Sequence, residues 1–531
     1  MYCGDETGSF IGEIGSHVSR FGYGGEDSPK YVVPSLCFES DNAETSNLHV
    51  STSCYRRKGT NYRTPLRSVQ VPSDLSEQPI VDPASFLQQG DSIEDWDAYE
   101  TLWQSAFDSL HVTDQFKHTK GGGNYKQNSA ASGVTSGTVQ ATQISDGKCV
   151  HPLLIVSPGC THRVGSTAYD QAAHRKEMSQ LTELVMEKLC AKAMFVAPAP
   201  MLAAFAHGRQ TALVVDIGAS GCRATPIVDG LVMKQAQRRN GRGGDWLGNV
   251  QWQALLKEKA GVVRPRYLVN NASDKNTSTG RGIFHRWAMQ DLMYEFRTSG
   301  NVSLAHWWYD PTVPFLYKDE EKKKKKTGSD DEDNEDDGSD GSSSDGDNNG
   351  QANNLLTTSS GNGSAIYELP DGTLVDLTTR IGKDLCRIPE LLFSEELPFL
   401  TEDYGQKHPN AADVYNEHPS LTNLPLPQLI HNSLSAVADV DARKELATSI
   451  LLTGGSSRFV NMEQRLSLEM PRITSSAFKC KVTASHNAIE RSCAPWIGGS
   501  ILSSLGSFQQ LWLSRTEYEE YGTTLAVQRF P

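Results

Sequence analysis

The chain has 531 residues, of which 37% are hydrophobic and 21% are charged, and its net charge is −14. This is the composition of an ordinary globular protein, and the acidic balance excludes a chain that binds nucleic-acid phosphates over its whole surface. The longest nearly apolar stretch, Met194–Ala206, contains two prolines and is too short to span a bilayer, so we expect no membrane association. Because the chain is acidic, we also expect no sequence-specific nucleic-acid binding.

Two similar hairpins are predicted about 200 residues apart, beginning with Ser9–Ser16 and with Ala212–Ala219. Each has an apolar strand, then an acid, Ile-Gly, a small residue and a second extended run. Backbone N–H groups in such a turn form an anion-binding nest, and the acids, Glu13 and Asp216, can hold a divalent cation through water. Together, the two hairpins predict a site that binds a nucleoside triphosphate and its metal from both sides. Two ordinary hairpins are the alternative, which the paired occurrence disfavours.

Further elements follow in chain order. Apolar residues at helical spacing predict helices over Glu94–Leu110 and Arg175–Leu189, and the short apolar run Pro152–Ser157 predicts a strand. Ile450–Ser457 reads as a strand that enters a glycine-rich turn, with a helix over Asn461–Leu468. Glycine in that turn would let the backbone approach a base or ribose. The alternation predicts an α/β protein with two lobes of related topology.

Three stretches lack regular patterning: Asn42–Thr64, Thr119–Lys148 and Asp319–Gly363. Thr119–Lys148 is rich in Gly, Ser, Thr, Asn and Gln, which predicts a flexible insertion. Asp319–Gly363 is predicted to be a disordered insertion, because the run Lys322–Lys326 and ten acids within Asp330–Asp347 cannot bury apolar surface. A nuclear import signal and a solvated loop are both consistent with the lysines. The acids would attract basic partners such as histones, or would act as a plain solubilising loop.

The N-terminus lacks the regions of a secretory signal, and the ten cysteines include no C-x-x-C pair. We therefore expect an intracellular protein with reduced thiols, without a zinc site or a disulfide framework.

These motifs resemble the actin family. The resemblance is carried by Glu13–Arg20, Gly22–Pro29, the turn Asp216–Gly218 and, most specifically, Trp496–Ser514 followed by Glu517–Glu520. It covers the whole chain except the three irregular stretches. It implies an actin-like ATPase fold, with two lobes around an ATP cleft and a ribonuclease-H-like core in each lobe.

Within that family, the chain is most similar to the nuclear actin-related proteins of class four. The segments that suggest this class are Gly4–Glu6, Gly24–Pro29, Glu94–Asp97, Tyr367–Gly372 and Ile388–Phe393. The resemblance implies that residues 1–206 form the first lobe, completed by residues 494–531, and that residues 207–493 form the second.

The resemblance also implies the contacts of Mg-ATP. Glu13 and Asp216 match the two acids near the metal, which they would hold through water. The predicted nucleotide contacts are Gly15, Ser16, His17, Arg20, Gly218, Ala219, Ser220, Gly244, Asp245, Gly454, Gly455, Ser456 and Phe459. Arg20 stands where actins have lysine, which keeps the cation and adds bidentate geometry.

Four departures from actin bear on the chemistry. Ala199 falls where actins place a glutamine that orients the attacking water, and alanine cannot hydrogen-bond a water. Arg223 falls at the position of an assisting histidine, and Ala219 at that of an acid. Because phosphoryl transfer depends on positioning, these losses predict a cleft that holds ATP without splitting it. Ser492 falls where actins have a lysine near the adenine, and the loss of that lysine lowers the nucleotide affinity that we expect.

The resulting hypothesis is a non-catalytic, ATP-binding structural subunit of nuclear chromatin-remodelling and histone acetyltransferase complexes. The resemblance implies that it pairs with nuclear actin on a helical segment of a remodelling ATPase or acetyltransferase scaffold. The alternatives are a small-molecule kinase, for which we find no acid or base beyond the metal-site acids, and a filament-forming ATPase. A filament would need the loop of actin that binds DNase, which Asn42–Thr64 does not resemble.

Overall fold

The computed structural model covers most of the predicted elements. The predicted insertions Thr119–Lys148 and Asp319–Gly363 lie outside the residues that it describes. Those residues are 8–40, 48–52, 60–66, 92–110, 112, 151–158, 171–258, 263–269, 282–299, 366–376, 385, 388–393 and 424–530.

The first of two large sheets is built around the first hairpin. Its six strands run in the order β17-β8-β7-β1-β2-β3, with β1 antiparallel to β2 and parallel to β7. Its strands are β1 Phe10–Ile14, β2 Val18–Tyr23, β3 Tyr31–Pro34, β7 Leu153–Ser157, β8 Ala193–Pro198 and β17 Leu513–Ser514. The predicted hairpin and the strand at Pro152–Ser157 are therefore confirmed.

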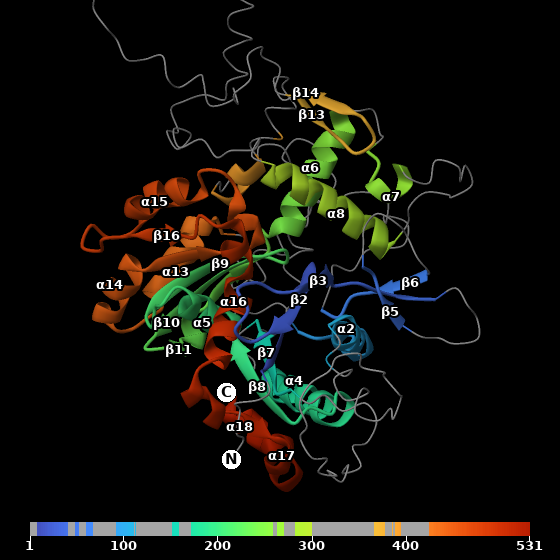
Figure 1. Ribbon diagram of the computed structural model, residues 1–531. Coiled ribbons are helices and arrows are strands. Elements are labelled where there is room, and N and C mark those ends of the chain that lie inside the picture. The colour runs from blue at the N-terminus through green and yellow to red at the C-terminus, as the bar shows by residue number, and fades with distance from the viewer. Residues whose placement is uncertain are drawn as a thin grey trace, which may run out of the picture.

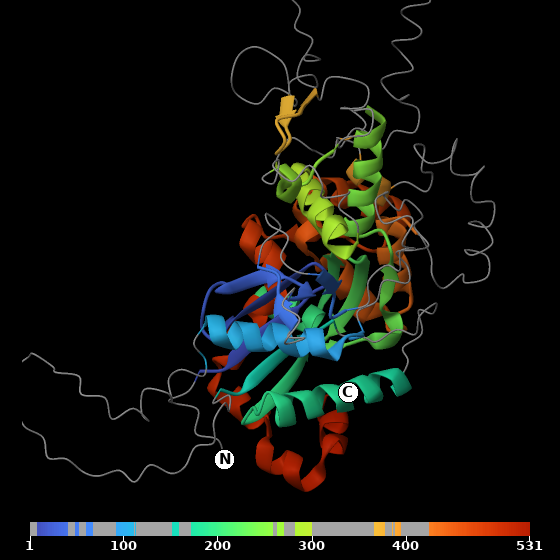
Figure 2. The ribbon, with the colours of Figure 1, turned by 90° about the vertical axis from the view of Figure 1, so that its right-hand side faces the viewer.

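Helices cover this sheet and complete its core, which contains Phe10, Trp103 and Met178 (Figure 2). The helix predicted at Glu94–Leu110 is confirmed as α2, and Asp95 caps it by accepting a hydrogen bond from the Ala98 N–H. The helix predicted at Arg175–Leu189 is α4, which continues into a π-helical turn. The elements here are α2 Trp96–Ser109, α4 Gln171–Glu183, the π turn Leu184–Lys188, α17 Arg515–Tyr521 and α18 Thr523–Arg529.

The second sheet is built around the second hairpin. Its strands run in the order β11-β10-β9-β15-β16, and β12 pairs with β10. They are β9 Ala212–Ile217, β10 Cys222–Val228, β11 Leu231–Val232, β12 Arg238–Asn240, β15 Ile450–Thr453 and β16 Val482–Ala484. Strand β15 lies parallel to β9, as β7 does to β1 in the first sheet. The two sheets therefore repeat one arrangement of a hairpin beside a parallel strand.

Most helices of the second half lie beside this sheet, as Figure 1 shows, and they share one large apolar core with it. The helix predicted at Asn461–Leu468 is confirmed as α15. The helices are α6 Gly244–Glu258, α7 Arg266–Val269, α8 Ile283–Thr298, α13 Leu426–Ser435, α14 Val440–Thr448 and α15 Met462–Ile473, with short 3-10 turns at Lys234–Ala236, Ile388–Leu392, Gly455–Arg458 and Gly506–Gln510. These findings confirm the predicted α/β class.

Two helices connect the sheets. They are α5, Ala199–Ala206, and α16, Ala488–Ser503, which lie against each other near the centre of Figure 1. Leu202 and Trp496 pack on the first sheet, whereas Ala203 and Ala494 pack on the second. A Cβ at Gly498 would overlap the backbone of Leu202, so glycine permits the close approach of the two helices.

The expectation that Asn42–Thr64 is irregular was wrong for its described parts. Two strands, β5 Leu48–Val50 and β6 Thr60–Arg63, pair with the two edges of β4, Cys37–Glu39. The strands are too short to show an alternating pattern in the sequence, and long-range packing stabilises them.

A second small sheet joins β13 Ile366–Glu368 to β14 Leu374–Asp376. None of the helices in the described part of the chain is long and apolar enough to cross a membrane.

Candidate functional site

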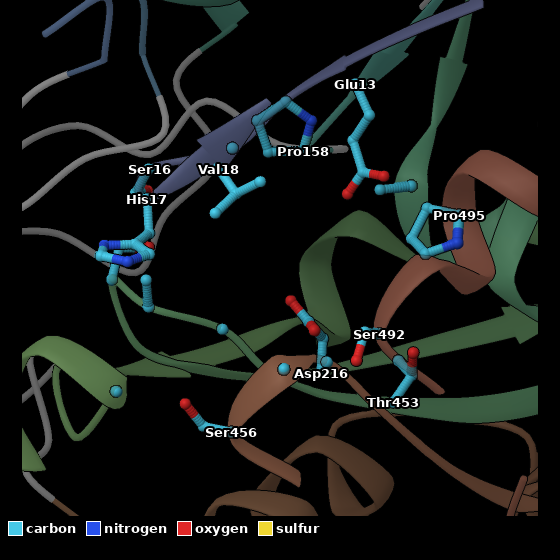
Figure 3. A pocket seen from close by; sticks show the side chains of 18 of the residues that line it. Glu13, Ser16, His17, Val18, Pro158, Asp216, Thr453, Ser456, Ser492 and Pro495 are labelled. Carbon is cyan, nitrogen blue, oxygen red and sulfur yellow. The ribbon is translucent and has the colours of Figure 1, made fainter. Parts of the chain in front are cut away.

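A cavity of about 240 Å³ lies between the two large sheets. Its walls come from the turns of both hairpins, from the turn after β15, and from α5, α8 and α16. All the predicted nucleotide and metal contacts line it except Phe459, which is buried in the core of the second sheet. Figure 3 shows Glu13 and Asp216 on opposite walls, each pointing into the space between them.

Glycine closes each hairpin turn. The Gly15 N–H donates to the carbonyl of Val18 at 3.2 Å, and the Gly218 N–H donates to that of Gly221 at 3.0 Å. Both N–H groups therefore already form hydrogen bonds within the protein. The intervening residues, Ser16–His17 and Ala219–Ser220, present the turns to the cavity. An anion-binding nest at these turns would therefore consist of their backbone N–H groups rather than of the glycine amides.

The first residues of α6 form backbone hydrogen bonds with the second turn. The N–H of Gly244 donates to the carbonyl of Gly218 at 2.9 Å, and that of Asp245 donates to the carbonyl of Ala219 at 3.0 Å. A Cβ at Gly244 would overlap the hydroxyl of Ser456 in the third turn. The start of α6 and the third turn therefore approach each other at a distance that favours glycine at position 244.

Gly454 is required by its conformation as well as by its neighbours. Its φ is 97°, in the region that favours glycine, and a Cβ there would overlap the carboxylate of Asp216. The Gly454 N–H donates to the carbonyl of Arg491 at 3.0 Å, which ties the turn to α16. The third turn thus fixes the acid at the end of β9.

The acid of the first hairpin forms an ion pair. Arg20 Nη1 lies 3.1 Å from Glu13 Oε1, and the other carboxylate oxygen, Oε2, is buried and has no hydrogen-bond partner among the residues that the structure describes. Burial raises the pKa of Glu13, and the charge of Arg20 opposes that rise. An orphaned oxygen aimed into a cavity opposite Asp216 fits a hydrated divalent cation. In the described residues, no group of three or more His, Cys, Asp or Glu lies close enough together to hold a metal ion.

One wall of the cavity was not predicted from the sequence. Helix α8 contributes Gln290, Asp291, Tyr294 and Arg297. Arg297 is buried, and its Nη2 donates to the carbonyl of Gly244 at 3.0 Å, while the hydroxyl of Tyr294 also accepts from Arg458 Nη1 at 3.1 Å. The available signal was the helical spacing of these polar residues among buried apolar ones.

The departures from actin all line the cavity. Ala199 is the first residue of α5, and its methyl group offers no hydrogen bond. Arg223 Nη1 donates to the carbonyl of Pro158 at 3.4 Å. The hydroxyl of Ser492 donates to the carbonyl of Ala488, within its own helix, at 2.7 Å. No side chain at these three positions replaces the water-orienting amide, the assisting histidine or the lysine.

Comparison with known proteins agrees with this arrangement. A family described as Actin matches residues 4–531. Proteins named Actin-related protein 4 are similar to the chain over nearly all of both lengths. The one from Arabidopsis thaliana is 28% identical over 545 residues, with all of both chains covered. The one from Oryza sativa subsp. japonica is 29% identical, also with all of both chains covered, and the one from Schizosaccharomyces pombe is 26% identical, with 98% of this chain and 96% of that protein covered.

Proposed function

Because the chain belongs to the actin family, whose members generally bind a nucleotide with a divalent metal, we propose that it is an ATP-binding actin-related protein that does not hydrolyse its nucleotide. The observation that carries the proposal is Ala199. The cavity keeps two facing carboxylates and three turns that contain glycine, but a methyl group stands where a water-orienting side chain is needed.

Residues of the protein would hold the nucleotide at three points. The backbone at Ser16–His17 and Ala219–Ser220 would contact phosphates, and the turn at Gly454–Ser456 would contact the ribose and base. Glu13 and Asp216 would hold the waters of a magnesium ion, which would neutralise phosphate charge when bound. In this proposal the protein binds and encloses the nucleotide, and none of the cavity residues named here activates a water molecule for hydrolysis.

The biological role in this proposal is structural and nuclear. The resemblance to class-four proteins and the relatives named Actin-related protein 4 support a subunit of chromatin-remodelling and histone acetyltransferase complexes. Its partners would be nuclear actin and a helical segment of the scaffold subunit, bound as a helix in a groove. Histones would be a further partner if the acidic insertion engages them.

Two experiments test the two parts of the proposal. Calorimetry with Mg-ATP, followed by a single-turnover assay with labelled ATP, should show binding with negligible phosphate release. Affinity purification from nuclei, with mass spectrometry, should recover actin together with a remodelling ATPase or an acetyltransferase scaffold. Absence of nucleotide binding would refute the first part, and recovery of cytoskeletal filament proteins instead would refute the second.

A further inference from the structure

The two lobes touch at a second place, away from the connecting helices α5 and α16. Helix α8, which packs in the core of the second sheet, also contacts β6 of the small sheet (Figure 1). The rings of Tyr62 in β6 and Phe284 in α8 lie 4.8 Å apart, and Tyr267 meets Phe284 edge-on at 5.0 Å. With Leu36 and Trp287, these residues form one apolar cluster, here called the aromatic latch.

The aromatic latch is a well-packed contact. Leu36 has no exposed surface, Phe284 is 2% exposed and Trp287 is 9% exposed. Separating the two sides would bring these side chains into water, which is unfavourable in proportion to the apolar area exposed. The contact therefore opposes any motion that parts β6 from α8.

Trp287 also connects the aromatic latch to the first hairpin turn. Its ring is stacked on that of His17, with the centroids 4.8 Å apart and an interplanar angle of 14°. Its Nε1 donates to the carbonyl of His17 at 3.2 Å. The turn predicted to contact phosphate is thus held directly by a residue of the opposite lobe.

One helix carries both the aromatic latch and a wall of the cavity. Asp291 and Tyr294 follow Trp287 at four and seven residues, the spacing that places side chains on one face of a helix. Both line the cavity, and Asp291 Oδ1 lies 4.0 Å from His17 Nε2. Moving α8 away from β6 would therefore widen the cavity and release the turn at His17 together.

From this arrangement we infer that the aromatic latch holds the cleft shut over its ligand and sets the rate at which a bound nucleotide leaves. The inference rests on the proposed binding of ATP. Release requires the lobes to part on the side of the cavity opposite the α5–α16 connection, and the aromatic latch is the contact that this opening breaks. The ligand is a nucleoside triphosphate whose phosphates lie at the turn stacked on Trp287.

The test uses the full-length protein loaded with etheno-ATP and chased with excess ATP, with release followed by fluorescence. Phe284→Ala and Trp287→Ala should each release the analogue about tenfold faster or more than the wild type. Phe107→Ala is the matched control, because Phe107 is also buried, at 5% exposed, but packs on Phe10 in the first core. It should lower stability and leave release unchanged. Equal release rates in all four proteins, or equal acceleration by the control, would overturn the inference.

A second measurement does not depend on nucleotide. Hydrogen exchange of β6 should become faster in Phe284→Ala, while that of the buried strand β15 stays as in the wild type. If the wild type takes up no etheno-ATP, the proposed function fails and this measurement alone decides whether the aromatic latch closes the cleft. Unchanged protection of β6 would show that the aromatic residues do not hold the lobes together.

Discussion

Arg20 and Glu13 face each other across the β1–β2 hairpin, with Nη1 and Oε1 3.1 Å apart. The residue predicted to contact phosphate and the residue predicted to hold the metal are thus partners in one ion pair. Both side chains are mostly buried, with 17% and 15% of their surfaces exposed. Both residues line the cavity, so this ion pair contributes to the charge that a ligand at the first turn would meet.

The first prediction concerns the cost of breaking this pair. Arg20→Met leaves a largely buried carboxylate without its cation, which should cost up to the ~3–5 kcal/mol typical of buried pairs. The double variant Glu13→Gln, Arg20→Met removes both charges and should recover most of that loss. Urea unfolding of the wild type, both single variants and the double variant gives the coupling energy. A double variant as unstable as Arg20→Met would contradict this account.

The hairpins could be predicted because each keeps its pattern within a short segment. The apolar run, the acid and Ile-Gly are all local, and the sheets confirm both copies. The strand β6 could not be found in this way, because Tyr62 is stabilised by Phe284, more than 200 residues away. The cavity wall formed by α8 was missed for a similar reason: its polar residues become a site only when the second lobe faces the first.

The second prediction concerns the glycine of the third turn. Gly454→Ala would combine a φ of 97° with an overlap of the new methyl group with the Asp216 carboxylate and the Ile217 backbone, so nucleotide binding should fall at least tenfold. Gly25→Ala is the matched control, because Gly25 has a φ of 87° but no atom within 4 Å of an added Cβ. Calorimetry with Mg-ATP should find its affinity close to that of the wild type. Equal losses in both variants would show that binding does not depend on the close packing of the third turn.

The third prediction places a larger group at the second turn. A Cβ at Gly218 would have ordinary contacts, the nearest being Asp216 Oδ2 at 3.5 Å, so the fold should tolerate a substitution there. The branched side chain of Gly218→Val would nevertheless occupy cavity space meant for phosphate, and binding should be abolished. Calorimetry beside a thermal unfolding curve separates the two effects. Tight ATP binding by a folded Gly218→Val protein would place the phosphates elsewhere.

The fourth prediction is that ATP turnover is negligible, because Ala199 and Ala219 cannot position water and Arg223 is bound to the Pro158 carbonyl. Ala199→Gln should give the largest gain among single substitutions, since it supplies an amide at the start of α5. Single-turnover phosphate release measures both proteins. Hydrolysis by the wild type at a rate typical of actin filaments would show that other residues orient the water.

The fifth prediction concerns acid stability at the C-terminus. The guanidinium of Arg529 and the Ser514 groups lower the pKa of Glu517 to about 2. Because the folded pKa lies below the ordinary 4.5, Glu517 stabilises the fold above pH 4.5, and that contribution is lost as the pH falls from 4.5 toward 2. The pair is partly exposed, so we expect about 0.5–1 kcal/mol. The difference in urea midpoint between wild type and Glu517→Gln should therefore be smaller at pH 3 than at pH 6.

The last prediction is that the protein does not form filaments by itself. A head-to-tail polymer grows only if both complementary surfaces are present on every copy. The segment Trp496–Ser514 resembles actin closely, so one surface should still bind an actin-fold partner. The opposite end differs at Asn42–Thr64, and the acidic insertion adds charge that repels a second copy. Sedimentation in polymerising salt should leave the pure protein in the supernatant, whereas actin and the scaffold helix should yield a ternary complex of fixed size. Filaments of the pure protein, or no ternary complex, would refute the prediction.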